Sequence, residues 1–89
     1  MKFEWDEKKN ARNKKIHGIS FETASLVFSD SSRIEIYDVE HSLDEDRYIA
    51  IGKVGKILFV VFTERGESIR LISARLADGE ERRIYYGEV

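Results

Sequence analysis

The spacing of apolar residues changes near residue 32, and this change limits the folds that are open to the chain. Before it, residues 6–28 have the composition and the capping residues of helices. After it, residues 33–75 alternate between polar and apolar residues or form short apolar runs, which indicates strands. Strands that are joined by short turns become antiparallel neighbours. The sequence therefore predicts an α+β fold in which helices pack on a sheet.

A short strand at Phe3–Trp5 and two helices are expected in the first third of the chain. Asp6 can cap the first helix, because its carboxylate can accept backbone N–H bonds from the first turn. This helix is expected to end at His17, since the glycine that follows can adopt the left-handed conformation of a helix end. Ser20 can cap a second, short helix over Phe21–Phe28.

A four-stranded antiparallel meander and a C-terminal helix are expected in the remainder. The strands are predicted over Arg33–Tyr37, Arg47–Val54, Ile57–Thr63 and Ser68–Arg75, and the helix over Ala77–Tyr86. The third of these strands is apolar on both faces, which predicts a central position. The last strand is expected to carry Ile69, Leu71 and Ser73 on one face and Arg70, Ile72 and Ala74 on the other. The helices should cover one face of the sheet and leave the other partly open, with Arg33 and Arg70 as candidate occupants.

Length and composition exclude several classes of protein. A chain of 89 residues is long enough for one domain, residues 1–89, and too short for two. It has no cysteine, which suits the reducing cytoplasm, and its N-terminus lacks the apolar stretch of a signal peptide. The longest apolar run, Ile57–Phe62, is far shorter than the roughly 20 residues of a membrane span, so no membrane partner is expected. Two distant histidines, His17 and His41, make no zinc signature, and neither a metal nor a cofactor is expected.

Charge is segregated along the chain. The net charge is −2, which argues against a non-specific nucleic-acid binder, since such proteins are usually basic. However, Lys8–Lys15 contains only basic charges, Asp38–Asp46 contains only acidic ones, and five arginines recur between Arg65 and Arg83. These blocks are either solvated faces or, for the basic ones, a local surface that attracts phosphate. The acidic block is either a solvated loop or a surface for a basic partner.

Motifs along nearly the whole chain resemble those of BrnT-like toxins. The opening motif comprises Trp5-Asp6, Lys9, Asn13, His17 to Glu22, Ala24, Phe28 and Asp30. The middle and the end comprise His41-Ser42, Glu45, Arg47, Gly52, Ile69 to Arg75, Ala77, Glu81-Arg82 and Tyr85. The matches keep their order and spacing, so their combination is specific. One departure is Ile16, where many relatives carry a lysine, and Lys15 is a candidate to replace that phosphate contact.

The resemblance implies a RelE-like fold and the toxin of a type II toxin–antitoxin system. It implies a metal-independent endoribonuclease that cleaves RNA and so inhibits translation and growth. The implied partner is a BrnA-like antitoxin of the ribbon-helix-helix type, which neutralises the toxin and through which alone the pair contacts operator DNA. Two alternatives stay open. One is a non-catalytic partner-binding module of the same fold that acts in transcriptional autoregulation, and the other is a structural subunit that oligomerises.

Metal-independent RNA cleavage uses the 2′-hydroxyl of the RNA as its nucleophile, so it needs cations, a titratable group and a surface for base stacking. The catalytic candidates are Arg70, Arg75, Lys9, His17 and Tyr85. The two arginines match phosphate geometry, although each could instead pair with an acidic neighbour such as Glu35 or Glu64. The histidine titrates near neutrality, although its place at a helix end also fits a capping role. The place of Lys9 and Tyr85 in the family pattern favours them, and Tyr86 is a second aromatic candidate for stacking.

Four further cations are candidates for binding RNA phosphates. They are Lys8, Arg12, Lys15 and Arg65. The first three belong to the first predicted helix, and Arg65 belongs to a predicted turn from which it could reach over the substrate. The alternative for each is an ordinary solvated side chain. These assignments together require that cations from separate segments converge on one groove of the folded chain.

Overall fold

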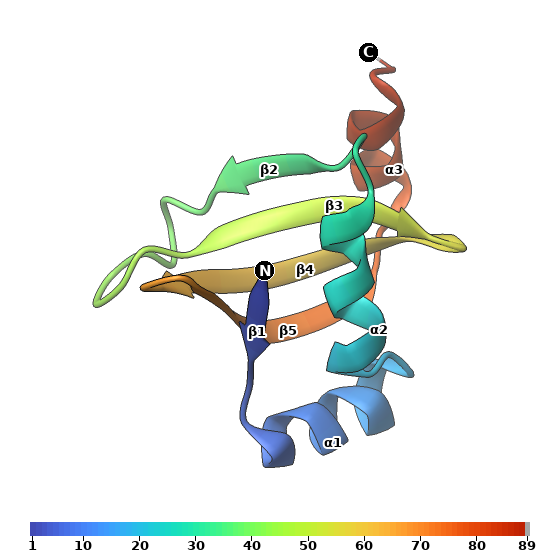
Figure 1. Cartoon of the computed structure of the whole chain (residues 1–89). Coiled ribbons are helices and arrows are strands. Elements are labelled where there is room, and N and C mark those ends of the chain that lie inside the picture. Colours follow the sequence, from blue (N-terminus) through green and yellow to red (C-terminus); the bar gives the residue numbers. More distant parts are fainter. Residues whose placement is uncertain (89) are drawn as a thin grey trace.

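The computed structural model describes residues 1–88 and combines a sheet with helices in the order that the sequence predicts (Figure 1). The elements are β1 Lys2–Glu4, α1 Glu7–His17, α2 Phe21–Ser25, the 3₁₀ helix η1 Leu26–Ser29, β2 Ile34–Tyr37, β3 Tyr48–Val54, β4 Lys56–Arg65, β5 Ser68–Leu76 and α3 Gly79–Tyr86. The second predicted helix is therefore an α-helix that continues as a 3₁₀ turn. No helix among residues 1–88 is both long enough and apolar enough to cross a membrane.

The five strands form one mixed sheet in the order β1-β5-β4-β3-β2. Strands β2 to β5 pair antiparallel with their neighbours in the chain, and β4 lies in the middle, both as predicted. Strand β1 adds to the outer edge of β5 in parallel, with Phe3 opposite Ile69. This long-range pairing makes the sheet mixed and places the start of α1 beside β5.

The predicted caps of the first two helices are present. The Asp6 carboxylate accepts hydrogen bonds from the backbone N–H groups of Lys8 and Lys9. Gly18 is left-handed, with φ of 73°, and its N–H donates to the Lys14 carbonyl at 2.9 Å. The Ser20 hydroxyl accepts from the N–H of Thr23. The capping side chains of Asp6 and Ser20 therefore set where α1 and α2 begin, and the left-handed backbone of Gly18 sets where α1 ends.

The main core lies between α1, α2 and η1 and one face of the sheet. The helices contribute Phe21, Ala24, Val27 and Phe28, and the strands contribute Ala50, Leu58, Val60, Phe62, Leu71 and Ala74. At Gly52 the absence of a side chain lets η1 approach β3 closely. A Cβ atom at that position would lie 2.6 Å from Cγ1 of Val27, which is shorter than any van der Waals contact.

A smaller apolar cluster lies on the opposite face of the sheet, where α3 covers one end. Its buried members are Ile51, Ile57 and Ala77, and Ile34, Ile49, Phe59 and Tyr85 pack against them. Helix α3 begins at Gly79, two residues later than predicted, after a capping box between Asp78 and Glu81. Ala77 is not helical, because its N–H donates to the Ile57 carbonyl at 2.9 Å and so extends the pairing of β5 with β4.

A bulge in β5 corrects the predicted face assignment. Ser73 lies opposite Val61, but Leu71 lies opposite Phe62, so Ile72 is an extra residue in the strand. The bulge shifts the alternation of the side chains by one position. Ala74 therefore lies in the main core with Leu71, and Ser73 lies on the other face with Arg70 and Arg75. A regular strand would have put Arg70 and Arg75 on opposite faces.

Arg33 also differs from the expectation, since it does not occupy the open face. Its guanidinium carbon lies 5.7 Å from the centroid of the Phe28 ring, and its Nε donates to Glu35 at 2.7 Å. The reason is the register of β2, in which Ile34 lies opposite Ile51 and faces the smaller cluster. The residues on either side of Ile34 must then point toward the helices.

Candidate active site

A groove of about 260 Å³ runs between α1 and the outer edge of β5, and we name it the α1–β5 groove. Its lining residues are Lys9, Arg12, Asn13, Ile16 and His17 from the helix, and Ile72 and Ser73 from the strand. Figure 1 shows α1 lying beyond β5, on the side of the sheet away from β2. Among residues 1–88, two cations and a histidine line the groove, and no carboxylate does. Such a concave surface favours an anionic ligand.

Helix α1 has no apolar stripe, and asparagines rather than hydrophobic residues anchor it. Asn13 is 7% exposed, and its amide nitrogen donates to the carbonyls of Ile19 and Ala74, both at 2.8 Å. Its amide oxygen accepts from the N–H of Ala74 at 3.1 Å. Strand β1 pairs with β5 only as far as Arg70. Beyond it, the side-chain amide of Asn13 takes the place of a neighbouring strand and satisfies the backbone N–H and carbonyl of Ala74. Asn13 thereby fixes the distance between the two walls of the groove.

Asn10 anchors α1 to the start of α2. Its amide oxygen accepts from the N–H of Phe21 at 2.7 Å, and its amide nitrogen donates to Glu22 at 2.8 Å. This hydrogen bond lowers the pKa of the Glu22 carboxyl. Sequence reasoning assigned no role to either asparagine. The sequence feature that could have indicated their role is the presence of two asparagines one turn apart inside a predicted helix, because asparagine is otherwise unfavourable there.

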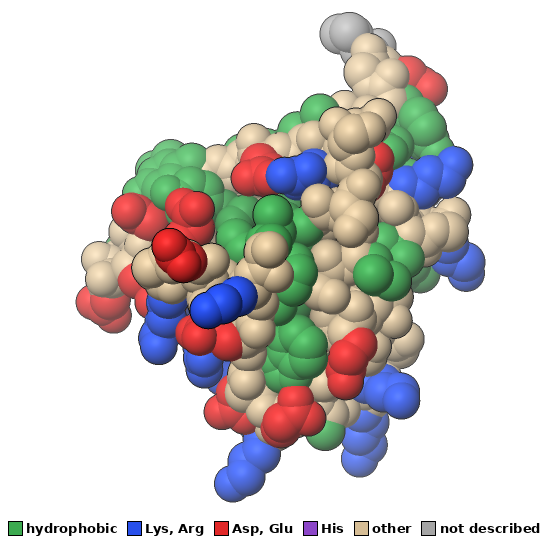
Figure 2. Space-filling view, in the orientation of Figure 1, with side chains coloured by type: hydrophobic (Ala, Val, Ile, Leu, Met, Phe, Trp, Pro, Cys, Tyr) green, Lys and Arg blue, Asp and Glu red, His purple; other side chains and the backbone are tan. Residues whose placement is uncertain are grey.

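Helical spacing brings the α1 candidates together only in part. Lys9, Arg12 and His17 share the side of α1 that lines the groove. Lys8 and Lys15, which were predicted to bind RNA, are exposed but do not line the groove. Figure 2 shows basic side chains projecting into solvent at the lower end of the molecule, where α1 lies. The solvated alternative therefore fits these two lysines better.

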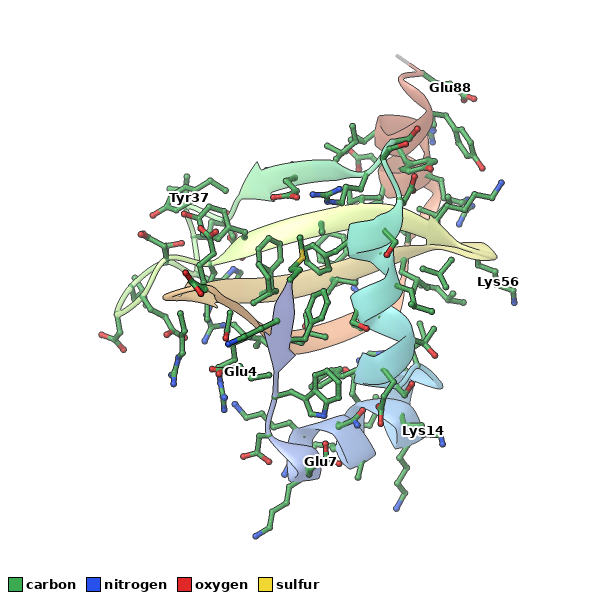
Figure 3. The ribbon with its side chains drawn as sticks, viewed as in Figure 1. Glu4, Glu7, Lys14, Tyr37, Lys56 and Glu88 are labelled. Carbon is green, nitrogen blue, oxygen red and sulfur yellow. The ribbon has the colours of Figure 1, made fainter. Side chains whose placement is uncertain are left out.

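Arg70 lies next to this groove. Its neighbour in the register of β1 is Glu4, and its Nη1 donates to Oε1 of Glu4 at 3.4 Å, a long contact (Figure 3 labels Glu4). The carboxyl of Asp6 has a pKa below its usual value, first because the N–H groups of Lys9 and Lys8 bind it. The positive charges of Lys9 and Arg70 lower this pKa further.

Arg75 lies on the same face of β5 but is held more firmly. Its two Nη atoms bind the two carboxylate oxygens of Glu81, at 2.7 and 2.9 Å. Its guanidinium carbon lies 4.0 Å from the centroid of the Phe59 ring. The hydrogen bonds raise the pKa of Arg75 and lower that of Glu81. The alternative of an acidic partner thus holds for both arginines, but the partners are Glu4 and Glu81 and not Glu35 or Glu64.

The remaining candidates lie outside the groove. The Tyr85 hydroxyl donates to Oδ2 of Asp30 at 2.6 Å, which raises the pKa of Tyr85 to about 12. Arg65 is the last residue of β4, not part of a turn, and its guanidinium lies 4.0 Å from the carboxylate of Glu45. In the described part of the chain, no cluster of histidine and acidic side chains could hold a metal ion.

In sequence and in fold, the chain is similar to known ribonuclease toxins. A family model described as the ribonuclease toxin BrnT of type II toxin–antitoxin systems matches residues 5–81. Among solved structures, the Brucella abortus ribonuclease toxin BrnT is similar, with 30% sequence identity and a TM-score of 0.65. The match covers 88% of this chain and 97% of the Brucella chain. No match was found among curated protein sequences.

Proposed function

Because the chain belongs to the BrnT family of ribonuclease toxins of type II toxin–antitoxin systems, we propose that the α1–β5 groove is the active site of a metal-independent endoribonuclease. One observation carries this proposal. Lys9, Arg12 and His17 converge in a groove without a carboxylate, beside the strand that bears Arg70. A phosphodiester in this groove would meet positive charge together with an imidazole that can accept or donate a proton.

The proposed reaction is attack of the RNA 2′-hydroxyl on the adjacent phosphorus. The O2′–P bond forms and the P–O5′ bond breaks, which leaves a 2′,3′-cyclic phosphate and a free 5′-hydroxyl. His17 is the group in the groove that would take the proton from the 2′-hydroxyl and give a proton to the leaving 5′-oxygen. Lys9, which lines the groove, and Arg70, two residues before Ile72 on β5, would stabilise the negative charge of the phosphorane. Arg12 would bind a neighbouring phosphate.

Arg75 and Tyr85 are weaker candidates for a direct role, although both remain predictions. Each would have to leave a carboxylate, Glu81 or Asp30, before it could contact RNA. Arg75 also loses its contact with Phe59 if it moves. We propose that the arginine holds the open face of the sheet in position, and that the tyrosine ties α3 to the segment after η1.

The proposal extends to the cellular target of the toxin, to its antitoxin and to its fold family. The toxin would act on cytoplasmic RNA, so that its activity stops translation and growth. A BrnA-like ribbon-helix-helix antitoxin would neutralise it, and operator DNA would be contacted through that antitoxin. The packing of α1, α2 and η1 on one face of a mixed sheet, with α3 at one end of the other face, fits a RelE-like variant of the α+β fold.

The test is cleavage of single-stranded RNA by the purified chain in the presence of a metal chelator, with detection of 2′,3′-cyclic phosphate ends. Replacing His17 with glutamine should lower kcat/KM by about 10²–10⁴-fold, the usual contribution of an acid or base. Lys9→Gln and Arg70→Gln should lower it as well, while expression of either variant should no longer arrest growth. Lys14→Gln is the matched control, because Lys14 lies on α1 outside the groove.

Two results would contradict the assignment. If folded His17→Gln, Lys9→Gln and Arg70→Gln variants stay fully toxic, the active site lies elsewhere. If the wild-type chain leaves RNA intact at high concentration but still binds its antitoxin and the operator, the non-catalytic alternative is correct.

A further inference from the structure

A second cationic pocket, of about 310 Å³, lies at the turn between β3 and β4, where α3 follows the end of β5. Its lining residues are Lys53, Gly55, Lys56, Ile57, Leu76, Ala77, Arg82 and Tyr86. We name it the hairpin pocket. It shares no lining residue with the α1–β5 groove. Of the candidates discussed above, only Tyr86, the second aromatic candidate for stacking, lines it.

The cations of the hairpin pocket are unpaired, unlike those of the open face. Among residues 1–88, Lys53, Lys56 and Arg82 form no ion pair, and no carboxylate lines the pocket. Nη1 of Arg82 donates to the carbonyl of Ala77, a lining residue, at 2.9 Å, which fixes the guanidinium at the pocket. Three uncompensated charges around one concavity favour a phosphate, since the field of the charges adds there.

An exposed aromatic ring stands beside these cations. Tyr86 is 55% exposed, although it lines the pocket. Its ring packs edge-on against Tyr85, with centroids 5.1 Å apart at 84°, and Tyr85 is itself tied to Asp30. The Tyr86 ring is thus supported by a fixed neighbour and still open to solvent. Leu76, which is 47% exposed, adds apolar surface to the same pocket. A planar base is the ligand that fits such a ring.

Strand β5 connects the two concavities. Ser73 lines the α1–β5 groove, and Leu76 lines the hairpin pocket. At about 3.3 Å per residue, three residues along a strand put the two backbone positions roughly 10 Å apart. Their side chains point to opposite faces, so the path between the two concavities crosses the outer edge of β5, which β1 leaves free beyond Arg70. A single-stranded polynucleotide can follow this path, and proteins that bind such strands combine a basic groove with aromatic stacking surfaces.

We infer that the hairpin pocket binds one nucleotide of single-stranded RNA that flanks the scissile phosphate, with Lys53, Lys56 and Arg82 on its phosphate and Tyr86 stacked on its base. This inference rests on the proposed ribonuclease function. It adds a subsite outside the catalytic groove, one that extends the RNA footprint toward α3.

The probe is fluorescently labelled RNA in which every ribose carries a 2′-O-methyl group, because such RNA lacks the nucleophile and stays intact during binding. Oligonucleotides of about 4 and about 16 nucleotides bracket the usual footprint of one small domain. Fluorescence anisotropy gives the dissociation constant at several salt concentrations. The logarithm of the association constant falls linearly with the logarithm of the salt concentration. Each lost phosphate contact should make this line less steep by about 0.7 for single strands. We therefore expect this reduction for Lys56→Gln and for Lys53→Gln with the longer oligonucleotide.

Lys14→Gln is the matched control, because it removes the same charge from α1 at a distance from the pocket (Figure 3 labels Lys14 and Lys56). Its slope should equal that of the wild type. Tyr86→Leu should weaken binding of the longer oligonucleotide by at least about fivefold without a change in slope, since stacking involves no counterion release. Tyr37→Leu, at a tyrosine of similar exposure on β2, should leave binding unchanged.

The outcomes separate the two proposals. If the wild-type chain neither binds nor cleaves RNA, both proposals are wrong. If it does both, while Lys56→Gln keeps the wild-type slope and Tyr86→Leu keeps the wild-type affinity, only the hairpin pocket is refuted. If the variants bind RNA normally but escape neutralisation by the antitoxin, the pocket is a protein-binding surface and the RNA subsite is wrong.

Discussion

Asp30 joins three segments of the chain through one carboxylate. Oδ2 accepts from the Tyr85 hydroxyl of α3 at 2.6 Å and from the N–H of Lys53 in β3 at 2.8 Å, and Oδ1 accepts from the N–H of Ser32. The hydrogen bond from Tyr85 is the main reason why the pKa of Asp30 is lowered. The same bond is the main reason why the pKa of Tyr85 is raised to about 12. The pair of Asp30 and Tyr85 therefore makes folding stability depend on pH in both the acid and the alkaline range.

The alkaline and acid limbs of the stability curve should both depend on this pair. The pKa of Tyr85 is about 12 in the fold and about 10 in the unfolded chain, so its stabilisation is complete below pH 10 and disappears as the pH rises through 12. The lowered pKa of Asp30 means that its stabilisation is present above the unfolded value of 3.8 and is lost as the pH falls further. Thermal unfolding should be measured for the wild type and for Tyr85→Phe at a series of pH values. The difference in Tm between the two proteins should be largest at intermediate pH. A difference that does not vary with pH would contradict this linkage.

At the scale of elements, local rules predicted the caps and most boundaries. Asp6, Gly18 and Ser20 act where the sequence places them, because a cap needs only a side chain and the next few backbone groups. The central position of β4 followed from its two apolar faces. Helix α3 began later than expected, because Ala77 found a backbone partner in Ile57 across the sheet. Sequence patterns do not report such a contact between distant segments.

The bulge at Ile72 is the feature of the candidate site that the sequence pattern did not predict. Strict alternation along β5 separates Arg70 from Arg75, and only the extra residue returns them to the same face. The carboxylate partners of these arginines were also unpredictable, because they come from β1 and from the start of α3. The cationic side of α1 was predictable, since helical spacing alone aligns Lys9 with Arg12.

The contact between α1 and β5 should depend on the amide of Asn13. Asn13→Ala leaves two carbonyls and one N–H without their partner, and each buried unpaired group costs about 1–3 kcal/mol before water relieves part of it. We expect a loss of about 2–4 kcal/mol in the free energy of unfolding, measured by urea denaturation. Lys14→Ala on the same helix is the control and should change stability by less than about 0.5 kcal/mol. Equal effects of the two substitutions would mean that Asn13 does not anchor the helix.

The contact between η1 and β3 should depend on the absence of a side chain at position 52. Gly52→Ala brings a Cβ atom to 2.6 Å from Cγ1 of Val27, so one element must move. Overpacking of this kind costs about 1–3 kcal/mol. Val27→Ala removes the clashing methyl group, so the double variant should be less destabilised than the sum of the two single variants, by roughly 0.5–3 kcal/mol in a double-mutant cycle. Strict additivity would show that the two residues do not compete for the same space.

At the scale of the whole molecule, the charge is divided among surfaces. The net charge is −2, yet the α1–β5 groove and the hairpin pocket are lined by cations and by no carboxylate. The acidic block Asp38–Asp46 forms the connection from β2 to β3. Its last carbonyl, of Asp46, accepts from the hydroxyl of Thr63 at 2.6 Å, and Thr63 lies opposite Arg70 in the sheet. The acidic segment thus ends close to Arg70 and to the proposed path of the RNA.

This arrangement predicts that the acidic segment slows the approach of RNA. Glu40 and Asp44 are exposed and form no ion pair among residues 1–88, so Glu40→Gln together with Asp44→Asn removes charge without breaking a contact. The double variant should raise kcat/KM for RNA and leave kcat unchanged, since repulsion acts on encounter and not on the chemical step. The gain should be largest near 0.01 M salt, where the Debye length is about 30 Å, and should shrink near 0.15 M, where it is about 8 Å. A gain that is independent of salt would show that this segment contacts the RNA directly.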